Sequence, residues 1–187
     1  SIGGGYEPYI THRFIYDGAV AYKLKEDNTL TVVSSLPGYT LPEDVVIPAT
    51  IGALEVNEIE EGAFYDEDGI VSVTIPDSVK TVGEGAFAGC DSLESVTLSK
   101  GIEGELVNTF ADCTSLKSVT IPEGVTALDG TFNGCTVLEN IKFAQSLTAL
   151  KNKALYGTAL DNIPVPDTIT TFDDGENEGG TIFPTGC

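Results

Sequence analysis

Residues 75–97 read IPDSVKTVGEGAFAGCDSLESVT, and this 23-residue block recurs along most of the chain. The aromatic residue of the block returns every 22 or 23 residues, at Phe64, Phe87, Phe110 and Phe132, and Leu155 takes its place in the last copy. The Ile-Pro junction that opens the block falls at Ile47, Ile75, Leu98, Ile121, Phe143 and Val165. A fixed period of this length predicts a solenoid, in which each unit buries its apolar face against its neighbours.

Each unit contains two segments with a recognisable local pattern. The segment L-x-x-V-x-I-P has apolar residues at alternating positions, which predicts a short strand that ends at the proline. The segment A-F-x-x-C predicts a single helical or 3-10 turn with its Phe pointing inward. The expected fold class is therefore a β-rich solenoid with one short parallel strand per repeat and short helical or 3-10 turns on the convex side.

The chain divides into four predicted segments. Residues 1–12 are Gly-rich and predict a flexible leader. Residues 13–44 contain two β-type runs, which predict a hairpin that covers the open end of the solenoid. Residues 45–172 hold the repeats, and the first unit is longer than the others, with the excess expected on a loop. Residues 173–187 form an acidic, Gly-rich tail.

The charge of the chain limits what it binds. Of its 187 residues, 29 are acidic and 9 are basic, so the net charge is −20. A field of this sign repels phosphate backbones and anionic lipids, which argues against nucleic acid and membrane surfaces as partners. No run approaches the roughly 18 apolar residues of a membrane span, so direct membrane insertion is not predicted. The chain contains no Met, and we expect it to come from a longer precursor, so its lack of a signal segment does not decide its location.

The string I-P-x-x-V-x-x-V-G-x-x-A-F-x-x-C-x-x-L-x-x-V resembles the repeat of BspA-like leucine-rich-repeat proteins. The resemblance is strong over residues 45–170 and loose over 14–44, where residues 22–32 resemble the strand-turn-strand found ahead of such arrays. It implies a leucine-rich-repeat solenoid with an N-terminal β-hairpin cap. It also implies a bacterial cell-surface or secreted protein that binds host proteins or other cells, without a catalytic site or cofactor.

Two units depart from the repeat pattern. Residues 102–109 of the third unit and 129–131 of the fourth do not match the regular spelling. Both departures are expected to perturb the convex side and to leave the strand side intact.

Cysteines and carboxylates are the candidate metal ligands. Cys90, Cys113 and Cys135 share one repeat position and are expected to form a column, which could bind a soft metal or fill a tight apolar layer. Three thiols, where a structural zinc site needs four ligands, favour packing. The acidic clusters at 66–69 and 173–178 lack calcium-loop spacing, which favours solvated loops. His12, the only His, lies in the leader, and Cys187 ends the chain. The prediction is therefore no catalytic, metal or cofactor site.

The strand segments supply the candidate binding site. Residues on either side of the central Val of each strand are expected to point away from the core. They form two largely uncharged columns on a very acidic chain: Ser72, Thr74, Ser95, Thr97, Ser118, Thr120, Asn140, Lys142 and Asn162. Ser and Thr also simply suit an exposed strand, which is the alternative explanation. The functional interpretation is a flat hydrogen-bonding platform, whose lack of aromatic residues favours a protein partner over a glycan.

Together these features predict a non-catalytic, adhesin-like module, located outside the cell or at its surface. Its expected partner is a host or cell-surface protein, bound through the strand face of the solenoid. The alternatives are a structural spacer that displays another domain of a larger surface protein, a glycan-binding module, and an enzyme, which a pocket with converging carboxylates would support. The sequence does not indicate an oligomeric state.

Overall fold

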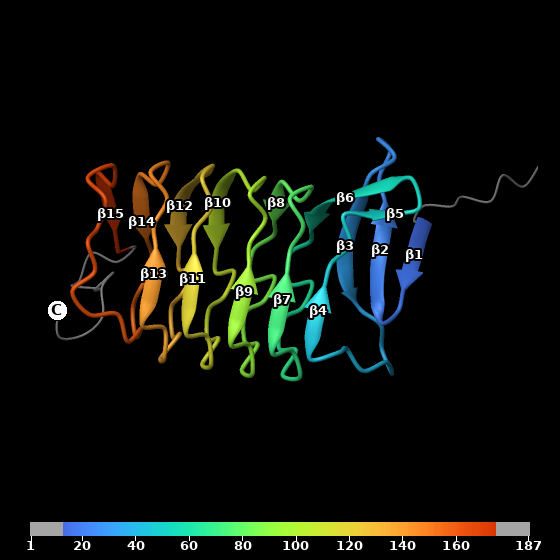
Figure 1. Cartoon of the computed structure of the whole chain (residues 1–187), viewed down its shortest axis with the longest axis horizontal. Coiled ribbons are helices and arrows are strands. Elements are labelled where there is room, and N and C mark those ends of the chain that lie inside the picture. The colour runs from blue at the N-terminus through green and yellow to red at the C-terminus, as the bar shows by residue number, and fades with distance from the viewer. Residues whose placement is uncertain (1–12, 175–187) are drawn as a thin grey trace, which may run out of the picture.

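The computed structural model of the protein describes residues 13–174, which form an elongated solenoid of strands and turns without a helix (Figure 1). Successive repeats stack along one axis, and each places one short strand in a parallel front sheet. The order in that sheet is β13-β11-β9-β7-β4. Its strands are β4 (Asp44–Val46), β7 (Ser72–Thr74), β9 (Ser95–Thr97), β11 (Ser118–Thr120) and β13 (Asn140–Lys142).

A second row of strands closes the other side of the solenoid. The repeat pattern predicted one strand per unit and did not predict this row. The row is parallel along β10 (Gly104–Val107), β12 (Val125–Asp129), β14 (Ala149–Lys151) and β15 (Thr171–Asp173). Nearer the N-terminus the same row contains β6 (Leu54–Ile59) and β8 (Thr81–Val82), which are also parallel. The extra length of the first repeat forms the short strand β5 (Thr50–Ile51), antiparallel to β6.

The N-terminal cap continues this second row. The predicted hairpin is formed by β2 (Val20–Leu24) and β3 (Leu30–Ser35), and β1 (Arg13–Asp17) adds an antiparallel third strand. Strand β3 pairs in parallel with β6, and its Leu30 and Val32 are fully buried. The cap therefore covers the apolar end of the first repeat. The predicted leader 1–12 and nearly all of the tail 173–187 lie outside the described residues, and the segment boundaries remain predictions.

The A-F-x-x-C segment forms a series of β-turns, so the predicted helical or 3-10 turn is wrong. In the second repeat the Ala88 N–H donates to the carbonyl of Gly85 at 3.0 Å, within the turn. The Phe87 N–H instead donates to the carbonyl of Thr109 in the next repeat, also at 3.0 Å. Positive φ angles at Gly85 (62°) and Gly89 (73°) interrupt any helical path. Every second N–H of this segment therefore donates to a carbonyl of the next repeat, whereas in a helix it would donate within the segment.

Two columns of equivalent side chains, one of Phe and one of Cys, run through the core. The Phe rings at 64, 87, 110 and 132 stack in sequence, with centroids 5.2, 5.7 and 5.8 Å apart. The thiols of Cys90, Cys113 and Cys135 are buried, and each donates to the carbonyl of the Phe one repeat earlier, at 3.0–3.1 Å. Burial raises the pKa of the Cys90 and Cys135 thiols to about 12 and also raises that of Cys113. The cysteine column predicted from the sequence therefore occupies the core.

Candidate functional site: the outer face of the front sheet

The front sheet places the predicted columns on its outer face. Along each strand the central residue packs inward and its two neighbours face outward, as the exposed-buried-exposed pattern of β4 and β11 shows. The first column runs through Ser72, Ser95, Ser118 and Asn140, which are register partners in turn. The second contains Thr74 paired with Thr97, and Thr120 paired with Lys142. We call these residues the front columns.

The structure does not bring Asn162 into the front columns. The sheet ends at β13, and Asn162 lies in the following bend with a φ of 50°. A strand residue does not adopt this left-handed conformation. Pro164, at the position equivalent to Lys142, has no N–H to donate to a sheet. The last repeat therefore cannot extend the front sheet, although its spacing is regular.

Two residues of β4 extend the front columns, and neither was predicted from the sequence. Asp44 is the register partner of Ser72, and Val46 is the partner of Thr74. Val46 is 69% exposed, and the Ser72 hydroxyl donates to Asp44 Oδ1 at 2.5 Å. Residues 44–48 spell D-V-V-I-P and residues 72–76 spell S-V-T-I-P, so the shared x-V-x-I-P pattern was the signal available.

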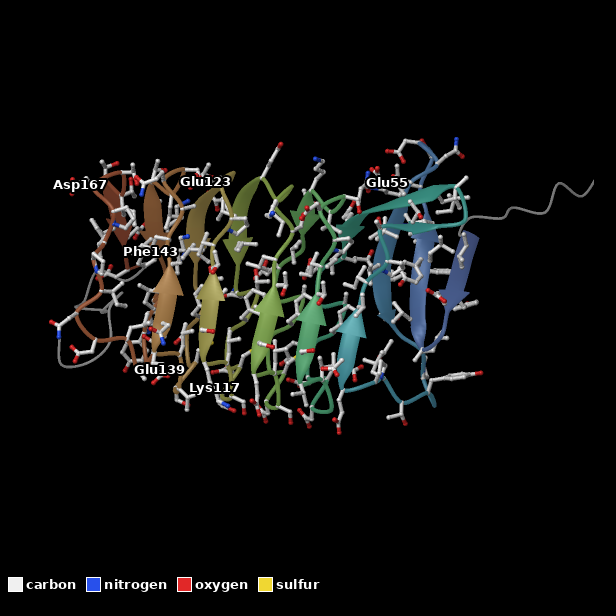
Figure 2. The ribbon with its side chains drawn as sticks, in the orientation of Figure 1. Glu55, Lys117, Glu123, Glu139, Phe143 and Asp167 are labelled. Carbon is white, nitrogen blue, oxygen red and sulfur yellow. The ribbon has the colours of Figure 1, made fainter. Side chains whose placement is uncertain are left out.

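Charged side chains gather at the starting ends of the front strands. Figure 2 shows Lys117 and Glu139 at that end, and Phe143 just beyond the tip of β13. The Lys117 ammonium lies 2.8 Å from Glu94 Oε2, and both side chains are largely exposed. Such a pair contributes little stability. The outward side chains of the front columns between Asp44 at one edge and Lys142 at the other carry only hydroxyl and amide groups.

The irregular third repeat changes both sides of the solenoid. On the back, the β10–β12 pairing shifts register between Gly104 and Glu105. On the front, β9 and β11 share only the pair Ser95 and Ser118, whereas the pairs on either side of them share three positions each. The strand side next to the third repeat is therefore irregular as well, although the departure at 102–109 itself includes the back strand β10.

Shallow depressions mark the end of the face near β13. One of about 350 Å³ lies over β9, β11 and β13, and two of about 520 and 530 Å³ lie beyond the strand tips. Converging carboxylates do not line any of these three. Within residues 13–174, no group of three or more His, Cys, Asp or Glu side chains is placed to hold a metal ion. His12, Cys187 and most of the acidic tail cluster lie outside that range.

The repeat, the sheet and its face can be compared with known proteins. The BspA type leucine-rich-repeat region matches residues 57–177 in six copies. The chain belongs to the BspA-type leucine-rich-repeat family. A comparison with curated proteins found no match. In the part of this BspA-type chain that the structure describes, no helix is long and apolar enough to cross a membrane.

Solved structures of bacterial leucine-rich-repeat proteins share this fold. A leucine-rich cell surface protein of Faecalibacterium prausnitzii is 30% identical, with a TM-score of 0.62 over 86% of this chain and 50% of that one. A leucine-rich-repeat protein of Bacteroides capillosus is also 30% identical, with a TM-score of 0.64 over 70% of this chain and 98% of that one. The pneumococcal vaccine antigen PcpA shares the fold at 23% identity, with a TM-score of 0.67 over 86% of this chain and 46% of that one. The BspA-type chain thus spans about half the length of the Faecalibacterium protein.

Proposed function

We propose that this BspA-type chain is a non-catalytic interaction module that binds a protein partner through the front columns. We place it outside the cell or at the cell surface, as the name of the Faecalibacterium relative states for that protein. The observation that carries the proposal is the composition of the face. Hydroxyl and amide groups fill the front columns between Asp44 and Lys142, on a chain whose net charge is −20.

The cost of desolvation favours these groups in an interface. A carboxylate or ammonium in an interface must give up its hydration, and it repays that cost only when it meets a well-placed opposite charge. Hydroxyl and amide groups lose less on burial and both donate and accept hydrogen bonds. Exposed Ser95, Thr97, Ser118 and Thr120 therefore form the part of the surface that a partner covers at low cost. The Ser95–Ser118 pair of the parallel sheet also holds the spacing of these two side chains, which lowers the entropy lost on binding.

The test replaces the centre of the face. Ser95, Thr97, Ser118 and Thr120 are changed together to Lys, and the variant is used to capture partners from solubilised matrix and epithelial surface proteins. Four ammonium groups cannot be buried in an interface unless opposite charges pair with them. The variant is therefore expected to lose the proteins that the wild type captures. Quantitative mass spectrometry of the captured fraction is the readout.

A matched control carries the same four-charge change on the other side of the solenoid. Thr81, Thr126, Thr170 and Thr171 are also exposed, and their replacement by Lys is expected to leave capture unchanged. Thermal unfolding of both variants checks that the solenoid is intact. Equal capture by the two variants would show that the front columns are not the binding surface and would favour a structural spacer.

A further inference from the structure

The backbone ladder of the front sheet has one opening. After each front strand, the next N–H donates to a carbonyl of the following repeat: Ile47 to Thr74 at 3.0 Å, Ile75 to Thr97 at 2.9 Å and Ile121 to Lys142 at 2.8 Å. The equivalent bond from the Leu98 N–H to the Thr120 carbonyl is not formed. The sheet is therefore open between β9 and β11 at the tips of these strands.

The segment beside the opening bonds to the repeat on its other side. Ser99 stands where most repeats have proline, and its hydroxyl donates to the Val79 carbonyl at 2.6 Å. The Lys100 N–H donates to Asp77 Oδ1 at 2.9 Å. Both bonds hold the segment after β9 against the second repeat. The fourth repeat does not close up against this segment. Leu98 and Thr120 therefore line the depression of about 520 Å³.

That depression has an apolar wall and two cations. Pro122 and Phe143 contribute apolar surface, and Lys100, Lys142 and Glu123 lie beside them. Lys142 also lines the depression of about 350 Å³ on the strand face and the one of about 530 Å³ next to Val165. The three hollows therefore meet at Lys142, and we call them together the trough. Phe143 lies at the tip of β13 in Figure 2.

The two cations of the trough are available for a ligand. Lys25, Lys117 and Lys151 are engaged by carboxylates, whereas Lys100 and Lys142 are exposed and form no ion pair within residues 13–174. The carboxylate of Glu123, which lines the same depression, accepts the N–H groups of Gln145 and Ser146 at 2.9 and 3.1 Å and forms no ion pair with either lysine. These backbone bonds hold the pKa of Glu123 below its usual value.

We infer that the trough binds an extended peptide segment in which a carboxylate stands next to an apolar side chain. The inference rests on the proposed function and specifies which chemical groups the partner presents. The carboxylate pairs with Lys142, aided by Lys100, and the apolar side chain packs against Pro122 and Phe143. The unpaired Leu98 N–H and Thr120 carbonyl offer the peptide main chain one donor and one acceptor, as a strand edge does in peptide recognition. Lys100 and Lys142 supply charge complementarity on a chain that otherwise repels acidic ligands.

The test selects ligands without assuming a partner. Random dodecapeptides displayed on phage are enriched on the wild type, on Lys142→Glu and on Lys117→Glu. Lys117 is the matched control, because it undergoes the same charge reversal and lies at the starting ends of the front strands, whereas Lys142 lies at the tip of β13. We expect wild-type selections to be rich in Asp or Glu beside an apolar residue. A synthetic peptide of that kind should bind Lys142→Glu at least about tenfold more weakly and Lys117→Glu within about twofold of wild type.

A change in the peptide tests the contact with Lys142 directly. Replacing its carboxylate by the amide should weaken binding to the wild type and hardly change binding to Lys142→Glu, as expected for two groups in contact. Selected peptides without acidic residues, or equal affinity for both Lys variants, would overturn the inference. If protein capture by the front columns persists while no peptide is enriched, the trough inference fails and the proposed function stands. If the front-column variant keeps its partners, the proposed function fails instead.

Discussion

The carboxylate of Asp66 occupies the space where a side chain on Gly89, one repeat later, would begin. The φ angles of the two residues are 57° and 73°, so both lie in the left-handed region. Asp112 and Gly134 repeat this relationship two units further along. The rule in this turn is therefore that an Asp in one repeat requires a glycine at the same position of the next.

Replacing Gly89 by Ala is expected to destabilise the solenoid for two reasons. A Cβ in the left-handed region costs roughly 1–2 kcal/mol, and the Cβ overlaps Asp66 Oδ1. Gly157 has a φ of 76°, and no atom lies closer than 3.6 Å to the place that a Cβ would take there, so Gly157→Ala should show the first cost alone. We expect Gly89→Ala to lose about 1 kcal/mol more than Gly157→Ala in urea unfolding. Adding Asp66→Gly to the Gly89→Ala variant should recover this extra loss of about 1 kcal/mol. Equal losses for the two Ala variants would contradict the rule.

The buried thiols should make stability fall at alkaline pH. The folded-state pKa of Cys135 is raised by burial to about 12 from an ordinary value of 9.0. Below pH 9 the thiol is protonated in both states and has no effect. Above pH 9 the unfolded chain releases the proton while the folded chain keeps it, so the free energy of unfolding falls by about 1.4 kcal/mol per pH unit and per such thiol. Unfolding at about pH 8 to 10.5 under reducing conditions measures the slope, and Cys135→Ala should make it shallower. An unchanged slope would mean that this thiol does not contribute.

Phe110, one of the two inner rings of the Phe stack, should contribute strongly to the core. Phe110 is fully buried and stacks on Phe87 and Phe132, so Phe110→Ala is expected to cost about 3–5 kcal/mol. Phe110→Leu copies the residue that the last repeat carries at Leu155, and should cost less than about 1.5 kcal/mol. Denaturant unfolding of both variants, followed at two wavelengths, measures both losses in the free energy of unfolding. A similar cost for the two variants would show that ring stacking, and not filled volume, dominates at this position.

The cap should protect the first repeats more than the last. Leu30 is fully buried at the junction of β3 with β6, so Leu30→Ala removes packing where the cap meets the array and should cost about 2–5 kcal/mol. Because each repeat contacts only its neighbours, the loss should be local. Hydrogen exchange is expected to quicken first in β6 and β8 and least in β14. Uniform quickening along the chain would show that the solenoid unfolds as a single unit.

The repeat architecture could be predicted from the sequence, because the regular spacing of its apolar residues indicates which side chains are buried. Phe and Cys return at a fixed interval, and residues at one interval position can be buried only by stacking on their equivalents. The alternation around Val73 and Val119 likewise identified Ser72, Thr74, Ser118 and Thr120 as outward residues, because side chains alternate along a strand. The β-turns were predicted as helical, since a short A-F-x-x-C segment fits either form, and only the neighbouring repeat decides where its N–H groups donate.

Tertiary structure alone decided where the front face begins, ends and opens. Asn162 leaves the face because Pro164 cannot donate a ladder bond, and Asp44 joins it because β4 meets β7. The Leu98 N–H lacks its ladder bond at the point where Ser99 and Lys100 bond to the second repeat, in contacts between residues about 20 positions apart. A periodic sequence determines which residues face inward or outward, since that depends on local geometry. Whether two neighbouring strands meet along their full length depends on contacts between repeats, which no local pattern contains.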